Sequence, residues 1–263
     1  MLSLLAVLSF APAARSRNGE TGFLNRVVKM GASSYVYQVY VPSNWTKKKK
    51  WPVILFLHGA GERGDDGLIQ TQVGIGSAIR LRADRVPAIV VFPQCSKNRW
   101  WAEAQMQAQA LKALDQTMKE FNGDTVRVYL TGLSMGGHGT WVMASSNPAK
   151  FAAIAPICGL TRTPPGYGLA ESDSEASAPA DRYQAFAAKI GKTPVWVFHG
   201  DADPVVPVSE SRKMVEALKA AGNVRYTEYP GVEHNSWDKA YGEPEFFSWL
   251  LSQKLVSGEK ASR

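Results

Sequence analysis

The 263-residue sequence has only two cysteines, Cys95 and Cys158, so it is not a small fold held together by disulfides. Whether these two pair is left open, because both follow predicted strands whose ends can lie too far apart for an S–S bond. The apolar run at residues 2–10 is too short to cross a membrane, and no other stretch is long enough. Internal repeats, phosphate-binding loops, dinucleotide fingerprints and metal-ligand spacings are also lacking, so we expect no cofactor, no metal and no membrane partner.

Basic residues exceed acidic ones, and the formal net charge is +7. Much of the excess comes from the lysines at residues 47–50 and from the two ends of the chain, which indicates a solvated basic rim. We therefore expect no nucleic-acid partner. A hydrophobic content of 45% is enough for a large core, and the chain length fits a single α/β domain.

The N-terminal segment resembles part of a secretory signal. Residues 2–10 are apolar and are followed by Ala-Pro-Ala-Ala at residues 11–14, which is similar to a cleavage region, although no Lys or Arg precedes the run. We expect a secreted or periplasmic protein, with a cytoplasmic one as the alternative. Residues 1–20 are interpreted as signal-like or disordered, 21–255 as one catalytic domain, and 256–263 as a tail.

Short apolar runs alternate with segments of helical spacing along most of the chain. This alternation predicts an α/β fold with a mainly parallel central sheet, flanked by helices and without a large cap domain. Residues 161–181 are rich in Pro, Gly, Ser, Ala and acidic residues, and they are predicted to form a loop or flap beside an open cleft. The predicted strands are 27–30 and 34–41 (an antiparallel hairpin), 53–57, 88–92, 126–130, 152–157, 195–198 and 224–229; the predicted helices are 74–83, 102–121, 209–221 and 245–254.

The most informative segment is Gly-Leu-Ser-Met-Gly at residues 132–136, between the predicted strand 126–130 and a predicted helix. A Gly-x-Ser-x-Gly sequence in this context is typical of a nucleophile elbow. The glycines permit a tight turn, and the helix dipole favours negative charge beside the serine oxygen. We predict Ser134 to be a nucleophile; the alternative is a tight turn whose serine only caps the helix.

A serine hydroxyl needs a base to take its proton. His234 lies after the last predicted strand and before the last predicted helix, where the base falls in the chain order serine, acid, histidine. We predict His234 to be this base. His58 and His199 end predicted strands and are expected to brace the backbone, whereas His138 lies on the helix that follows the serine.

The base in turn needs a carboxylate that fixes its tautomer. Asp203 follows the predicted strand 195–198 and is held by Pro204, so we predict it to be the acid. Asp201 is expected to close the same turn through nearby N–H groups, and Asp238 to lie on a helix surface.

The oxyanion of an acyl-transfer intermediate needs two N–H donors that are already in place. We predict the N–H groups of Met135, directly after the serine, and of Ala60 in the Gly-Ala-Gly stretch at residues 59–61. The alternative for this stretch is a glycine-rich turn that binds nothing.

Three tryptophans are candidates for substrate contacts. Trp100 and Trp101 follow a predicted strand, and with Trp237 they are predicted to form an aromatic wall for an aryl acyl group. The alternative is that they pack beneath the rim of the site. Glu62 lies beside the predicted oxyanion loop and is a further candidate, unless it forms a surface ion pair with Arg63.

Four motifs, at residues 57–62, 132–137, 199–207 and 234–237, occur in an order similar to that of α/β-hydrolase serine esterases. Between residues 27 and 251 the chain resembles the predicted peptidase and phospholipase/carboxylesterase group, which is related to feruloyl esterases and polyhydroxybutyrate-depolymerase-like esterases. The resemblance implies ester hydrolysis through an acyl-enzyme, with Ser134, Asp203 and His234 at the matching positions. The segment 161–181 departs from the family pattern, because it is longer and more acidic.

Together these features predict a serine carboxylesterase that acts on small-molecule esters. The expected substrates are small-acyl or aromatic esters, such as feruloyl or other hydroxycinnamoyl esters from plant cell walls. The alternatives are a peptidase or lysophospholipase of the same fold, or a binding protein of this fold without activity. The three matching catalytic positions argue against the last.

Overall fold

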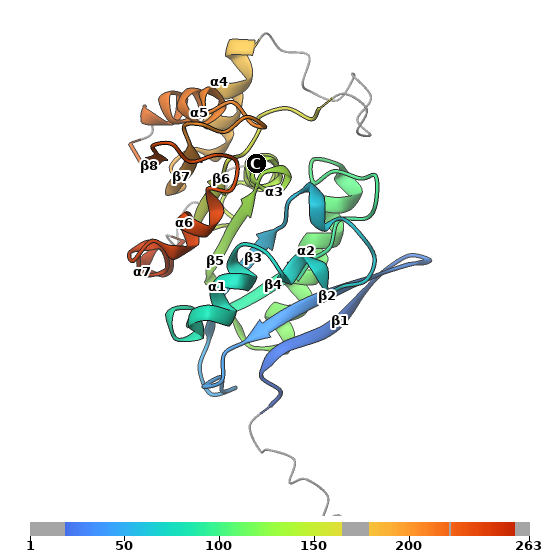
Figure 1. Cartoon of the computed structure of the whole chain (residues 1–263). Coiled ribbons are helices and arrows are strands. Elements are labelled where there is room, and N and C mark those ends of the chain that lie inside the picture. The colour runs from blue at the N-terminus through green and yellow to red at the C-terminus, as the bar shows by residue number, and fades with distance from the viewer. Residues whose placement is uncertain (1–18, 165–178, 221, 256–263) are drawn as a thin grey trace, which may run out of the picture.

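One eight-stranded sheet forms the centre of the protein (Figure 1). The computed structural model describes residues 19–164, 179–220 and 222–255. Its strands are β1 (Gly22–Met30), β2 (Ser33–Val41), β3 (Trp51–Leu57), β4 (Ile89–Pro93), β5 (Gly123–Leu133), β6 (Ala153–Ile157), β7 (Val195–Gly200) and β8 (Val224–Tyr229).

The strand order is β1-β2-β4-β3-β5-β6-β7-β8. β1 and β2 form an antiparallel hairpin, and β2 also runs antiparallel to β4. From β4 to β8 all neighbouring strands are parallel. The predicted α/β fold with a mainly parallel sheet is therefore confirmed.

Alternating side chains of the central strand point to opposite faces of the sheet. Every residue of β3 is buried, as expected for a strand that is covered on both faces. Val53 and Leu55 belong to one hydrophobic cluster, whereas Ile54 and Phe56 belong to the other. The continuous apolar run in the sequence is therefore the signature of a strand between two helical layers.

Helices cover both faces of the sheet (Figure 1). The cluster with Val53 contains residues of α2 (Ala104–Glu120), α3 (Met135–Ser146), α4 (Pro179–Ile190) and α5 (Ser209–Lys219). The cluster with Ile54 contains residues of α1 (Ile75–Arg82), α6 (Trp237–Gly242) and α7 (Phe246–Ser252). Three single-turn 3-10 helices complete the elements: η1 (Ala60–Glu62), η2 (Ile69–Thr71) and η3 (Ala83–Arg85). In the described part of the chain, none of these helices has the length and apolar character needed to cross a membrane.

Two helices correct the predicted element map. α4 begins at Pro179, so the loop predicted over 161–181 is wrong at its C-terminal end; proline is favoured in the first turn of a helix. α6 has six residues, too few to show helical periodicity in the sequence. Three predicted segments lie outside the described residues: residues 165–178 of that loop, most of the signal-like segment, and the tail 256–263.

The turn between β5 and α3 packs against the neighbouring strand with no room for side chains. A Cβ atom on Gly136 would lie 1.9 Å from the carbonyl oxygen of Leu57, and one on Gly132 would lie 2.4 Å from the carbonyl oxygen of Gly136. Both are far inside van der Waals contact. The two glycines therefore allow the backbone of this turn to lie directly against the end of β3.

We predict that Gly136→Ala destabilises the protein, because the added methyl group can only be accommodated by moving backbone. The free energy of unfolding should fall by about 1–3 kcal/mol, measured by urea denaturation. Gly242→Ala is the matched control, because nothing lies within 4 Å of a Cβ atom there. It should change stability by less than about 0.5 kcal/mol. Equal stability of the two variants would contradict this account of the turn.

Candidate active site

Ser134 occupies the tight turn between β5 and α3 in a strained backbone conformation. Its φ is 54° and its ψ is −116°, in a region that non-glycine residues rarely adopt. Backbone hydrogen bonds hold it there: the Ser134 N–H donates to Ile157 O at 2.9 Å, and the His138 N–H donates to Ser134 O at 3.0 Å. The turn has the strand–serine–helix geometry of a nucleophile elbow.

The structure brings Ser134, His234 and Asp203 into one line of hydrogen bonds. His234 Nδ1 lies 2.7 Å from Asp203 Oδ2, and His234 Nε2 lies 2.9 Å from Ser134 Oγ. Because an ionised carboxylate only accepts, Nδ1 carries the proton and Nε2 accepts the hydrogen bond that the serine hydroxyl donates. A serine whose proton faces an imidazole lone pair is poised for nucleophilic attack.

Asp203 is buried and surrounded by N–H donors. Its side chain has 0% exposure, and its Oδ1 accepts hydrogen bonds from the N–H groups of Val205 at 2.8 Å and Val206 at 2.9 Å. Burial by itself raises the pKa of this carboxyl, but hydrogen bonds from His199, His234 and the two backbone N–H groups outweigh it. They hold the pKa of Asp203 well below its usual range, so the carboxylate stays ionised at neutral pH.

The two other aspartates considered for this role lie elsewhere. Asp201 Oδ1 accepts the Gly231 N–H at 2.6 Å, so this residue closes a turn. Asp238 lies on α6, where its Oδ2 accepts a hydrogen bond from the Asn235 side-chain amide at 2.8 Å. It is Asp203 whose carboxylate accepts the Nδ1–H of His234.

The loop after β3 is held by the side chain of His58. Its Nε2 accepts the Cys95 N–H at 2.9 Å, so its Nδ1 carries the proton and donates to Gly59 O at 2.6 Å. Burial lowers the pKa of His58 to about 4, so the ring is neutral at pH 7. The carbonyl and N–H of one trans peptide point in opposite directions, so holding Gly59 O also fixes the direction of the Ala60 N–H.

This loop lies directly beside the serine. A Cβ atom on Gly59 would be 3.8 Å from the Cβ of Ser134. Met135 is the first residue of α3, and the first N–H groups of a helix have no acceptor within it. The two N–H groups proposed to bind an oxyanion therefore belong to segments that flank Ser134.

Two of the predicted substrate contacts are corrected by their burial. Trp101 is 0% exposed and donates its indole N–H to His58 O at 3.0 Å; Trp100 is 4% exposed and donates to His138 Nδ1 at 2.9 Å. Both rings pack inside the protein, against the loop after β3 and against α3, and they do not form an aromatic wall. The sequence shows that both follow a strand but not which side of the loop they occupy.

Trp237 lies next to His234, and Glu62 lies beside His58, with its Oε2 4.0 Å from His58 Nδ1. The Trp237 ring stands edge-on to the His234 ring, with centroids 5.4 Å apart and an interplanar angle of 90°. The Glu62 side chain is 20% exposed, and burial raises the pKa of its carboxyl. Arg63, the other member of the suggested ion pair, donates its Nε–H to Ala60 O at 2.9 Å.

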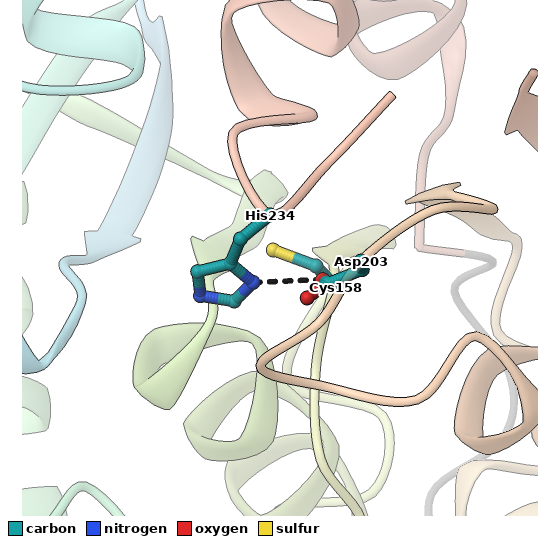
Figure 2. Close-up of side chains that lie close together, drawn as sticks. All are labelled: Cys158, Asp203 and His234. Atoms are coloured by element: carbon teal, nitrogen blue, oxygen red, sulfur yellow. Dashed lines mark hydrogen bonds and ion pairs between the residues drawn. The ribbon is translucent and has the colours of Figure 1, made fainter. Parts of the chain in front are cut away.

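Cys158 adjoins the acid and the base, as Figure 2 shows. Its Sγ, an Asp203 oxygen and a His234 nitrogen lie within 4.8 Å of one another, which makes them the one group close enough to hold a metal among the described residues. They do not fit a metal: N–H donors occupy both Asp203 oxygens, and burial raises the pKa of the thiol to about 12, so it stays protonated. Cys95 and Cys158 are both free and buried, so they do not form a disulfide.

The mostly parallel sheet with helices on both faces is that of an α/β-hydrolase. A family model described as "Putative esterase" matches residues 31–241. The chain belongs to this esterase family.

Three known proteins are similar to this chain in sequence or in structure. An uncharacterized secreted protein of Arthroderma benhamiae is 30% identical over 216 residues, which cover 73% of this chain and 22% of that protein. The bifunctional acetylxylan esterase/xylanase XynS20E of Neocallimastix patriciarum is 35% identical over 124 residues, which cover 46% of this chain and 17% of that protein. A solved thermostable esterase is 32% identical with a TM-score of 0.72, covering 88% of this chain and 63% of the other. The chain thus spans 22% and 17% of the lengths of the two curated relatives.

We predict that Asp203→Asn and Asp201→Asn have very different effects on ester hydrolysis. An amide at position 203 can donate to His234 Nδ1 and so favours the wrong tautomer, which should lower kcat on the order of 10³–10⁴-fold. Asp201→Asn removes only the charge at a turn and should retain activity within about fivefold. Initial rates with p-nitrophenyl acetate measure both. A larger loss in the Asp201 variant would contradict the assignment of the acid.

Proposed function

We propose that this chain is a serine carboxylesterase that works through an acyl-enzyme. The observation that carries the proposal is the unbroken line of hydrogen bonds from Ser134 through His234 to Asp203. Ser134 is the nucleophile, His234 the general base and acid, and Asp203 the group that orients His234 and stabilises its positive form.

In the first half of the reaction, Ser134 Oγ attacks the ester carbonyl carbon while its proton moves to His234 Nε2. The N–H groups of Met135 and Ala60 stabilise the oxyanion that develops. The carbonyl then re-forms, the C–O bond to the alcohol breaks, and the alcohol leaves with the proton from His234. In the second half, water loses a proton to His234 and attacks the acyl group, and the acid is released as Ser134 regains its proton.

The preferred substrate in this proposal is a small-acyl ester such as an acetyl ester. The relative XynS20E is an acetylxylan esterase by name, and the burial of Trp100 and Trp101 removes two of the three rings suggested for an aryl pocket. Trp237 remains as the aromatic contact beside His234 for an aromatic acyl group, the less favoured class. We further propose export from the cytoplasm, supported by the relative that is described as a secreted protein.

A panel of esters tests the proposal with the wild type and Ser134→Ala. The panel contains p-nitrophenyl acetate, butyrate and octanoate, methyl ferulate and a peptide anilide. We expect the wild type to prefer acetate, and Ser134→Ala to lose at least about a thousandfold in kcat/KM because no other nucleophile is activated there.

Each alternative has its own outcome in the same experiment. A preference for methyl ferulate would replace the acetyl proposal with the hydroxycinnamoyl one, and cleavage of the anilide alone would indicate a peptidase. Equal inactivity of wild type and Ser134→Ala on the whole panel, with no fluorophosphonate labelling at Ser134, would indicate a binding protein and end the esterase proposal.

A further inference from the structure

The carboxylate of Asp203 receives hydrogen bonds from two histidines, of which the catalytic proposal uses only one. His199, at the end of β7, has 0% exposure and places its Nε2 3.2 Å from Asp203 Oδ2 and 3.0 Å from Val206 O. The same Asp203 oxygen accepts His234 Nδ1–H at 2.7 Å. His199 was expected to brace the backbone, and its contact with Val206 O does so, but its contact with the acid is an additional one.

Donor and acceptor roles fix the tautomer of His199. The two groups near its Nε2 are a carboxylate and a backbone carbonyl, which can only accept. Nε2 therefore carries a proton and donates a bifurcated hydrogen bond to both. Its Nδ1 lies 2.7 Å from the hydroxyl of Ser211, which is 1% exposed on α5. In the neutral ring Nδ1 is an acceptor, so Ser211 donates to it. Ser211 thereby holds the ring in the orientation that presents Nε2–H to Asp203.

We propose that His199, whose ring is held in place by Ser211, is a positioning residue for the acid of this site. The proposal rests on the proposed function, since it concerns the orientation of Asp203 towards His234. The backbone N–H groups of Val205 and Val206 hold Asp203 Oδ1, and His199 holds Oδ2. The carboxylate is thus restrained at both oxygens while one lone pair of Oδ2 faces His234.

The second histidine also sets how strongly the acid attracts a proton. A carboxylate that accepts one hydrogen bond fewer is more basic, so it stabilises the positively charged form of His234 more strongly. Removal of the His199 donor should have this effect on Asp203. Because a protonated base cannot accept the serine proton, the acidic limb of the kcat/KM profile should move to higher pH.

Other charged and titratable groups near this pair are already engaged. Glu228 on β8 lies opposite His199 in the strand register, and its carboxylate accepts hydrogen bonds from Arg212 on α5 at 2.9 and 2.6 Å and from the Tyr226 hydroxyl. Cys158, from the end of β6, contributes a protonated thiol near Asp203. The expected change in pH profile is therefore assigned to the hydrogen bond between His199 and Asp203.

The test compares His199→Leu, His199→Gln and Ser211→Ala in the hydrolysis of p-nitrophenyl acetate between pH 5 and pH 9. His199→Leu keeps most of the volume but removes the donor, and it should lower kcat about 10- to 100-fold with KM changed less than about twofold. Its acidic limb should move to higher pH. His199→Gln can place an amide N–H near the position of Nε2–H and should recover most of kcat and the wild-type limb.

Ser211→Ala removes one buried oxygen atom and leaves His199 in place. It should lower kcat by about two- to tenfold and move the acidic limb in the same direction as His199→Leu, because the His199 ring loses the hydrogen bond that holds its orientation towards Asp203. If circular dichroism shows that His199→Leu does not fold, the result for Ser211→Ala decides the test. A shift in the opposite direction, or none, in Ser211→Ala would overturn the proposal.

Two controls separate this inference from the proposed function. If Ser134→Ala retains the activity of the wild type, the proposed function fails, whatever the His199 variants do. If Ser134 is required but His199→Leu and His199→Gln lose activity equally and keep the wild-type pH profile, only the positioning role is overturned and His199 has a packing role alone.

Discussion

Four N–H groups converge on the buried carboxylate of Asp203, and the geometry of the site depends on this arrangement. Two come from the turn that follows β7 and two from histidines that are far from each other in the sequence. A buried charge is costly unless it is hydrogen-bonded, and each oxygen of this carboxylate accepts two hydrogen bonds. The position of His234, and through it the hydrogen bond to Ser134, follows from where Asp203 is held.

The loop after β3, which carries the proposed oxyanion donor Ala60, is also held by hydrogen bonds, but these join neutral groups. His58 holds the carbonyl of Gly59, and Trp101 in turn donates to the carbonyl of His58. The strained backbone of Ser134 is restrained by the glycine-lined contact with β3. The segments on both sides of the serine are thus held in place by hydrogen bonds and packing, and the proposed stabilisation of an oxyanion requires such fixed donors.

The sheet and the central hydrogen-bonded line follow from local sequence, because each motif lies at the end of a strand and parallel strands end at one edge. The sequence predicted β3 from a continuous apolar run, β5 from an apolar, β-branched run, and Ser134 from its two flanking glycines. It did not show that Trp100 and Trp101 face inwards, since burial on either side of a loop has the same local pattern. The sequence also did not indicate the contact between His199 and Asp203, although the two residues are only four positions apart. The turn that brings Asp203 back to His199 is held by the backbone N–H groups of Val205 and Val206, and backbone N–H groups leave no signal in the sequence.

The most direct test of the central claim is the mass of the protein after a rapid acid quench of its reaction with p-nitrophenyl acetate, followed by peptide mapping. If the chain works as an esterase through the Asp203–His234–Ser134 line, a fraction of the protein gains the mass of one acetyl group on Ser134 during turnover. The same modification is absent from Ser134→Ala. An acetyl group on Cys95, Cys158 or a lysine, or turnover of the ester with no adduct at Ser134 under conditions that trap slow deacylation, would contradict the account.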